Sequence, residues 1–429
     1  MRRAAWSALL ACALSAAAAA ERLTLDEALA AVSAAHPDRR VAESELALSR
    51  ADREQAASRQ DFSLFLDGAL RTGRRPDDNG LNPYSGDWKP DNIGRIVARK
   101  PLLDFGRSSQ AIAAADQEIA ARQAALFNVE NLRRIDIMAR YFDVLLADQQ
   151  YVVDNEFMTV AYLDWDKARE RFELGIGSRP DLLQLEAFYQ DWRERRSASL
   201  QRMRSTRQKL AHAIYRPGKL PTELVEPQLK DNARPLPEYE SMLPWVIARN
   251  PRVLMLQAQA GAADARLAAV RAERNPTLDA EVIGGGYSRE STTRDELSAG
   301  LVFNIPLYQG RRVDARMERE RAQKERSVAE LEKLKLDLAD TLLATLQEIE
   351  WLRDSSRPAA GKQMEYRDWA LERARAEYEL ELKTNLGSSM AETQAAQLRH
   401  KQVEYRLALA LARLEALSGG SLPPVEGAQ

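Results

Sequence analysis

The chain has 429 residues, a formal net charge of −2 and 29% charged residues. This length allows one large domain or two ordinary ones. The balanced charge argues against a nucleic-acid partner, because phosphate binding requires a basic excess. Cys12 is the only cysteine, and the three histidines have no metal-ligand spacing. We therefore expect no disulfide, no metal site and no cofactor, and the carboxylates alternate with Arg and Lys without forming a catalytic constellation.

Residues 1–20 predict a secretory signal peptide. Arg2 and Arg3 precede a short apolar core, and small residues ending at Ala20 provide a cleavage site. The alternative is a lipoprotein signal in which Cys12 is lipidated. Either signal exports the chain from the cytoplasm. No later stretch has the roughly 18 consecutive apolar residues of a membrane helix, so any membrane-spanning part has to consist of strands.

The first of two predicted structural repeats covers residues 21–229. Thr24 and Glu27 form a capping box, which predicts a short helix at 23–35. Pro37 then opens a second helix, because its missing N–H is not needed at the first helical position.

A strand pair and a long helical hairpin follow in this repeat. Alternating apolar residues predict a strand of membrane length at about 61–73. A second strand is predicted at about 92–102, where Arg95, Arg99 and Lys100 weaken the alternation, as is usual in membrane barrels. Residues 107–173 contain neither proline nor glycine, and at about 1.5 Å per residue their helix would reach roughly 100 Å. A return helix at 180–215 completes the hairpin 107–215. Such long helices can be buried only by packing side by side.

The second repeat, residues 230–420, has the same order of elements. Its strands are predicted at about 277–288 and 294–305, its long helical hairpin covers 311–417, and residues 421–429 form a tail.

Two interruptions are expected in the second hairpin. Pro358 and Gly361 predict a kink near the middle of the outgoing helix. A break at about 382–389 should separate this helix from a return helix at 390–417.

Both repeats pass directly from a strand into a helix. In the second repeat the alternation of Leu297–Ile305 ends at Pro306, and Gly310 precedes the helix. In the first repeat, Pro101 corresponds to Pro306 at the end of the strand, and Gly106 corresponds to Gly310 before the helix. The Gly284–Gly286 run has no phosphate-loop context and predicts a kink or close packing within a strand. The helical tryptophans are predicted to pack between helices: Trp165, Trp192 and Trp369.

Each repeat supplies only two strands, and lipid tolerates no open sheet edge. Three chains would pool twelve strands, which is within the range of known membrane barrels. The predicted fold is therefore mainly α with a small membrane β part. Its duplicated strand–long-helix halves would form a trimeric twelve-stranded β-barrel continuous with an α-helical coiled-coil tunnel.

The chain resembles the TolC family of outer-membrane efflux proteins over about residues 22–419. The resemblance rests on the order and duplication of the following motifs: LTLDEAL at Leu23–Leu29, His36-Pro37 and Asn250-Pro251, the two Pro–Gly–Arg junctions, and RFELGIGSRPDLLQLEA at Arg171–Ala187. It implies a homotrimer in outer-membrane lipid with a periplasmic tunnel. It also implies docking to a periplasmic adaptor and an inner-membrane pump, with passive passage of a small molecule or polypeptide.

The resemblance also implies functional positions at the ends of the helical hairpins. The adaptor-docking tips correspond to Leu174, Gly175 and Ile176, and to Leu380, Glu381 and Leu382. Because Glu381 replaces the glycine of the family's turn, the second hairpin is expected to turn later, near Gly387. The tunnel-entrance candidates are Asp181, Gln184, Gly387, Met390 and Glu392.

Two other classes of function are compatible with the composition. A structural periplasmic coiled-coil protein would have loops in place of the strands, which the alternation of Leu297–Ile305 disfavours. A secreted hydrolase would need a catalytic site, and the sequence offers none.

Overall fold

The computed structural model describes the following residues: 22–30, 36–73, 88–218, 223–288, 295–381 and 386–424. The predicted signal peptide, including Cys12, lies outside them. The chain separates into two compact units, and each unit draws on both sequence repeats. The hairpin unit comprises residues 1–41, 127–251 and 335–429, and the sheet unit comprises residues 42–126 and 252–334.

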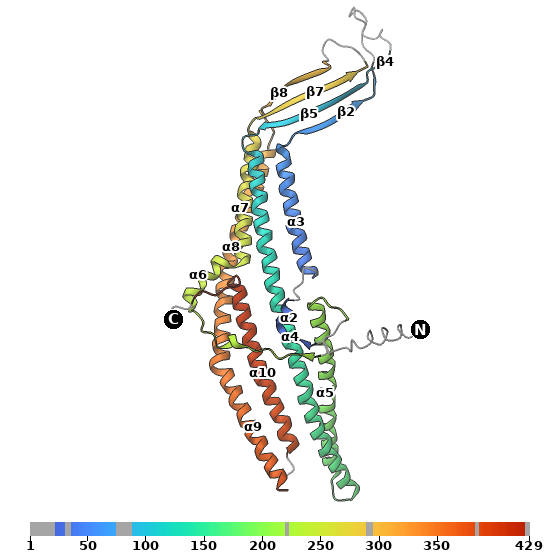
Figure 1. The fold of residues 1–429 in the computed structure, drawn as a ribbon, viewed down its shortest axis with the longest axis vertical. Coiled ribbons are helices and arrows are strands. Elements are labelled where there is room, and N and C mark those ends of the chain that lie inside the picture. Colours follow the sequence, from blue (N-terminus) through green and yellow to red (C-terminus); the bar gives the residue numbers. More distant parts are fainter. Residues whose placement is uncertain are drawn as a thin grey trace, which may run out of the picture. The chain divides into compact units, whose positions relative to one another are not determined.

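The sheet unit contains one four-stranded antiparallel sheet (Figure 1). Its strand order is β2 (Ser63–Ala69), β5 (Ile93–Leu103), β7 (Thr277–Tyr287) and β8 (Leu297–Asn304). Four predicted strands are thus present, with slightly different bounds. The stretch predicted at 61–73 is divided, because β3 (Thr72–Gly73) leaves the sheet and pairs with β4 (Lys89–Pro90).

Helical segments continue from these strands within the sheet unit. They belong to α3 (Pro37–Ala57), α4 (Arg107–Glu173), α7 (Pro251–Arg271) and α8 (Arg312–Trp351). Two of the helices, α3 and α7, are followed by short 3₁₀ turns, η1 (Ser58–Gln60) and η3 (Ala272–Arg274), which lead into β2 and β7. Val270, Val313 and Met317 form a small apolar core. Ion pairs such as Arg122–Glu45, at 2.8 Å, join neighbouring helices.

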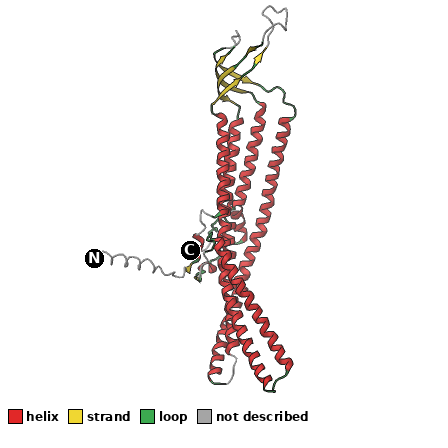
Figure 2. Cartoon of the chain, turned by 90° about the vertical axis from the view of Figure 1, so that its right-hand side faces the viewer, coloured by secondary structure: helices red, strands yellow, loops and turns green. Residues whose placement is uncertain are grey.

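The hairpin unit contains two long helical hairpins. The first joins the later part of α4 to α5 (Arg179–Ala213), and the second joins α9 (Arg357–Glu379) to α10 (Leu386–Leu417). Helices make up both hairpins in Figure 2, where they are drawn in red. Ser178 is the N-cap of α5, and its side chain accepts a hydrogen bond from the backbone N–H of Asp181 at 3.3 Å.

Short elements pack around these helices: β1 (Arg22–Leu23), α2 (Leu25–Ala30), β6 (Glu223–Leu224), η2 (Lys230–Ala233) and α6 (Tyr239–Arg249). The predicted capping box is present, because the N–H of Glu27 bonds to the Thr24 hydroxyl and the N–H of Thr24 to the Glu27 carboxylate. β1 and β6 pair in parallel. The buried Tyr141 hydroxyl lies 2.8 Å from the Leu23 carbonyl oxygen and so anchors this pair to α4.

Two predictions about the second hairpin need correction. The outgoing helix is irregular at Leu352–Ser356, a π-helical turn that precedes Pro358. Gly361 lies inside α9 without disturbing it. The return helix begins at Leu386 and not at 390, so Gly387 and Met390 are helical residues. The helix predicted at 107–173 has the predicted bounds.

Among the described residues, the structure contains no helix that is both long and apolar enough to cross a membrane.

Candidate functional site

The four-stranded sheet has one apolar face. The strand register places alternate residues of all four strands on the same side, and large apolar side chains dominate this side. Leu301 is 66% exposed and Leu66 is 82% exposed. The members of this apolar face are Leu64, Leu66, Ile96, Ala98, Leu278, Ala280, Val282, Leu297, Ala299, Leu301 and Phe303. An exposed apolar surface of this kind is expected where a sheet contacts lipid.

The opposite face carries paired charges. Arg95 on β5 donates to the Asp67 carboxylate on β2, with N–O distances of 2.6 and 2.8 Å. Arg99 on β5 donates to Glu281, its direct partner on β7, from Nε at 3.0 Å. Both arginines therefore fit an alternation of polar-face and apolar-face positions along β5. Arg95 and Arg99 both belong to the polar face, whereas Lys100 lies on the apolar face near the helix end of the strand.

Gly285 gives close packing on the polar face. A Cβ atom there would lie 3.0 Å from the Tyr287 hydroxyl and 3.2 Å from the Arg95 Cβ. The Tyr287 side chain therefore covers the glycine, as the Gly284–Gly286 run predicted.

The two outer strands of the sheet leave edges open. Among the described residues, β2 pairs only with β5 in this sheet, and β8 pairs only with β7. Open edges present unpaired N–H and C=O groups, which invite another strand. The sheet of one chain is therefore incomplete in an apolar environment.

The first hairpin tip exposes two large aliphatic side chains. Leu174 is 74% exposed and Ile176 is 78% exposed. Gly175 between them has φ +76°. Its N–H bonds to the Phe172 carbonyl at 2.9 Å, and the Ile176 N–H bonds to the Arg171 carbonyl at 2.9 Å. This is a Schellman helix end, in which glycine fits the left-handed position.

The second tip turns at Glu381, and the prediction that it turns near Gly387 is wrong. Glu381 has φ +56°, and its N–H bonds to the Tyr378 carbonyl at 3.0 Å, as Gly175 bonds to Phe172. A glutamate thus occupies the position that glycine has in the first tip. Leu380 is 68% exposed. Leu382, the remaining predicted tip residue, lies outside the described residues.

The entrance candidates of the first hairpin lie in the first turns of α5. Asp181 and Gln184 are both exposed. The Asp181 carboxylate lies in the first turn of the helix, where the helix dipole favours a negative charge. The structure therefore gives this carboxylate a helix-start role and leaves it accessible.

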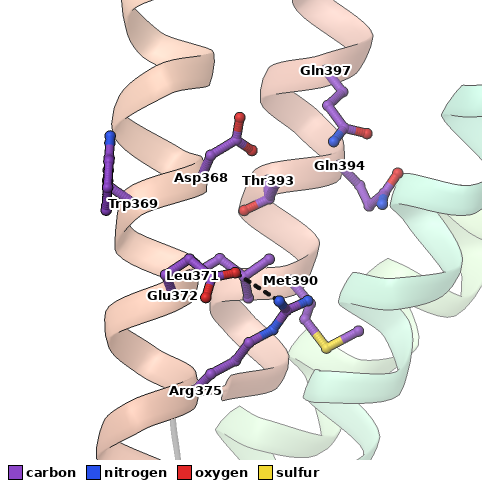
Figure 3. A pocket seen from close by; sticks show the side chains of 9 residues that line it. All are labelled: Asp368, Trp369, Leu371, Glu372, Arg375, Met390, Thr393, Gln394 and Gln397. Atoms are coloured by element: carbon purple, nitrogen blue, oxygen red, sulfur yellow. Dashed lines mark hydrogen bonds and ion pairs between the residues drawn. The ribbon is translucent and has the colours of Figure 1, made fainter.

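The candidates of the second hairpin face different surroundings. Gly387 approaches α4, since a Cβ atom there would lie 3.3 Å from a methyl group of Val160. The Glu392 carboxylate accepts a hydrogen bond from Arg367 of α9. Met390 is 42% exposed. It lines a cavity of about 520 Å³ between α9 and α10, whose other lining residues include Asp368, Glu372, Arg375 and Gln394 (Figure 3).

The structure adds Arg367, which the sequence analysis did not single out, and corrects the prediction for Trp369. Arg367 holds α9 to α10 through Glu392, and its carbonyl oxygen accepts a hydrogen bond from Thr393 at 3.2 Å. Trp369 was predicted to pack between helices but is 72% exposed. Trp165 and Trp192 do pack as predicted, with ring centroids 5.4 Å from Tyr189 and 4.5 Å from Phe157.

Comparisons with known proteins agree with this architecture. Residues 243–420 match the sequence model of the family described as outer membrane efflux protein. The outer membrane efflux protein BepC of Brucella suis biovar 1 (strain 1330) is 25% identical over 264 residues, which are 59% of this chain and 55% of BepC. The match therefore spans about half the length of that relative.

Solved structures show the same fold at low sequence identity. The outer membrane protein VceC of Vibrio cholerae is similar with a TM-score of 0.73 at 16% identity, over 93% of this chain and 97% of VceC. The CmeC outer membrane channel of Campylobacter jejuni is similar with a TM-score of 0.74 at 10% identity, over 93% of this chain and 86% of CmeC. The predicted mainly α fold with a small β part is confirmed, and so is the resemblance to outer membrane efflux proteins.

Proposed function

We infer that this chain, which is similar to outer membrane efflux proteins, forms the outer-membrane duct of an export system. We propose that three copies assemble, and that the duct works with a periplasmic adaptor and an inner-membrane pump. Such a system is either a tripartite efflux or a type I secretion system, and passage through the duct is passive.

One observation carries this proposal: the sheet has an apolar face, a charged face and two open edges. If β8 of one copy pairs with β2 of the next, three four-stranded sheets give a closed ring of twelve strands. Closure pairs the backbone N–H and C=O groups of both open edges, which a lipid environment requires. The apolar face then lies against lipid, and the Arg–Asp and Arg–Glu pairs line a water-filled interior.

The charge pairs also bear on what can pass. Arg95 with Asp67 and Arg99 with Glu281 place both signs of charge beside each other on the interior face. A wall of paired charges repels neither cations nor anions strongly. This arrangement is consistent with a wide, unselective conduit, with selection of cargo left to the pump.

The tips are the proposed docking points for the adaptor. Leu174, Ile176 and Leu380 present exposed aliphatic side chains at hairpin ends, where nothing within the described chain covers them. Charged replacements would make burial by a partner costly. We therefore expect Leu174→Glu with Ile176→Glu to abolish export while the trimer stays intact. Normal export by this double variant would remove the docking proposal.

The tunnel entrance is proposed at Asp181, Gln184, Gly387, Met390 and Glu392. In the closed state, polar contacts near Asp181 and between the return helices α5 and α10 would hold the mouth narrow. The adaptor would loosen these contacts by binding the tips.

Channel recording tests the function itself. The purified chain, reconstituted in planar lipid bilayers, should give discrete conductance steps, and heating that dissociates the trimer should remove them. The competing hypothesis is a structural periplasmic coiled-coil protein. A chain that is released by osmotic shock without detergent, and that gives no conductance, would support that alternative and contradict the duct.

A further inference from the structure

The four long helices of the hairpin unit form a layer with two faces. α5 packs on α4 through Phe157 and Trp192, whose ring centroids lie 4.5 Å apart. α4 packs on α10 through the stacked rings of Phe142 and Tyr405, which are also 4.5 Å apart. The ion pair described above joins α10 to α9. The order is therefore α5–α4–α10–α9, with α5 and α9 as the outer helices (Figure 1).

The short elements cover one face of this layer. On α4, the Tyr141 hydroxyl donates to the backbone of β1, and Met138 lines a cavity together with residues of α2. On α10, Lys401 binds Glu226, two residues after β6, at 2.9 Å, and Glu404 accepts a hydrogen bond from η2. In an open duct this face has to lie on the outside, because three copies of the short elements inside the ring would fill the passage. The opposite face then lines the interior.

This opposite face contains a groove between α4 and α5 with an excess of positive side chains. Arg140 and Asp143 follow Met138 and Tyr141 by two residues each, which is about 200° around a helix. Both therefore lie on the side of α4 away from the short elements. The groove has a volume of about 220 Å³. We call it the basic groove, and its lining residues are Arg140, Asp143, Arg202, Ser205, Thr206 and Lys209.

Two of the positive charges in the basic groove are unpaired. The Arg140 Nε atom donates to the Asp136 carboxylate at 2.8 Å, so this arginine already has a partner. The side chains of Arg202 and Lys209 are exposed and have no hydrogen bond or ion pair with any described residue. The lining holds three positive side chains and one negative one, that of Asp143. Such a groove fits a phosphate, sulfate or carboxylate group, which accepts charge-assisted hydrogen bonds from arginine and lysine.

A second row of positive charge lies on the same face of the layer. Arg399, Arg406 and Arg413 follow one another at intervals of seven residues on α10, opposite the side that binds the short elements. Arg406 donates to the Glu348 carboxylate at 2.7 Å. Arg399 donates to the uncharged side chain of Gln363, and Arg413 has no partner among the described residues. Two of these three charges are therefore not neutralised by an acidic neighbour.

We propose that the basic groove binds anionic groups of passing cargo, so that the hairpin part of the duct favours negatively charged molecules. This inference rests on the proposed duct and names the class of cargo for it. Three copies would place three grooves at one level of the tube, where the fields of fixed charges add between protein walls. The charges of the sheet are paired, so the preference arises in the hairpin unit.

The exposure of the groove fits passage and not storage. Arg202 and Lys209 both remain accessible to water, and an exposed charge pair is weak. Conduction requires sites that attract a molecule and also release it. The second row, on α10, gives a departing anion a further set of positive charges on the same face.

Charge selectivity of the reconstituted full chain tests the proposal. Channels are recorded in bilayers of neutral phosphatidylcholine, so that lipid charge contributes nothing. Under a KCl gradient, the reversal potential of Arg202→Gln with Lys209→Gln should shift from that of the unmodified chain towards the K⁺ equilibrium potential. In symmetric KCl, the concentration of inositol hexaphosphate that halves the conductance should rise about tenfold, because two charge-assisted contacts are lost in each copy.

Two further variants show whether charge in the groove is the cause. Arg202→Glu with Lys209→Glu should shift the reversal potential further in the same direction. Arg202→Lys with Lys209→Arg keeps both charges and should behave like the unmodified chain.

The matched control removes two charges from the other side of the same helix. Arg193 and Arg204 are exposed residues of α5 that lie about 180–200° around the helix from Arg202. Arg193→Gln with Arg204→Gln should therefore retain the reversal potential and the block by inositol hexaphosphate.

The outcomes separate this inference from the proposed function. Conducting channels whose reversal potential and block are the same with and without the groove charges overturn the inference and leave the duct standing. An equal loss of block in the control also overturns it, because the effect would then not depend on the groove. A chain that gives no conductance in any form contradicts the duct, and the inference falls with it.

Discussion

At the scale of single residues, the two hairpin turns solve the same problem with different side chains. Gly175 and Glu381 both have left-handed backbone conformations at corresponding helix ends. Glycine adopts this conformation without steric cost, whereas a residue with a Cβ atom is disfavoured by about 1–2 kcal/mol. The turn of the second tip therefore costs conformational free energy that the turn of the first tip does not cost.

Replacing Glu381 tests this penalty. Glu381→Gly should stabilise the turn by about 1 kcal/mol, because the left-handed strain is relieved. Hydrogen exchange of the α9 end, residues 372–381, should slow in this variant. The reciprocal change Gly175→Glu should make exchange at the end of α4 faster. Unchanged exchange in both variants would show that the turn geometry is not strained.

His36 and Asn250 occupy equivalent positions before the helix-opening prolines of the two repeats. The His36 Nδ1 atom accepts the Asp38 N–H at 3.2 Å, which requires a neutral ring. Burial, and then the charge of Arg133, lower the pKa of His36 below its ordinary 6.5, against the opposing effects of Asp38 and Asp136. The unfolded chain then binds the proton more readily, so stability falls as the pH drops below about 6.5.

Replacing His36 by the residue of the second repeat should remove this pH dependence. On acidification from about pH 8 to pH 5, the melting temperature of the hairpin unit should fall less in His36→Asn than in the unmodified chain. His212→Asn, at an exposed histidine, is the control and should behave like the unmodified chain. An identical acid response in all three proteins would exclude His36 as the titrating group.

At the scale of elements, neighbouring residues of one strand lie on opposite faces of the sheet, one apolar and one charged. Leu301 lies on the apolar face of β8 and Val302 on the charged face. Leu301→Arg should place a charge in lipid at a cost of about 2–4 kcal/mol and reduce the amount of heat-sensitive trimer in membranes. Val302→Arg should assemble normally, because its side chain reaches water. Equal amounts of trimer in the two variants would contradict the orientation of the sheet.

The sequence predicted most of the elements because their signals are local. Residues 107–173 contain no helix breaker, and the helix has those bounds. The alternation along Leu297–Asn304 predicted which residues share each face of β8. The turn of the second hairpin was misplaced, because glycine was assumed to be necessary for a left-handed residue. The irregularity before Pro358 was displaced towards Leu352–Ser356, because a π-helical turn has no local sequence signal.

The candidate site was less accessible to sequence reasoning than the fold. Its tip residues, Leu174, Gly175, Ile176 and Leu380, followed from a family resemblance and not from a local pattern in the sequence. The paired positions of Arg95 and Arg99 depend on strand register, which one strand alone does not reveal. Trp369 could not be assigned correctly, because a helical period shows which residues share a side but not whether that side is covered by the same chain.

At the scale of the whole molecule, each unit of one chain leaves surfaces or strand edges that other described residues do not cover. The sheet unit has two open edges, and the hairpin unit has two outer helices with uncovered flanks. In both units a first-repeat element lies at one side and a second-repeat element at the other. Copies of such units can close by adding to one another in a ring, which a single copy cannot do.

The mass of the detergent-solubilised particle tests this account most directly. Light scattering with the detergent contribution subtracted should give three chain masses, and a variant in which Val282→Pro interrupts β7 should not reach that mass, because proline removes a ladder hydrogen bond. A stable, correctly folded particle of one chain mass would contradict shared closure.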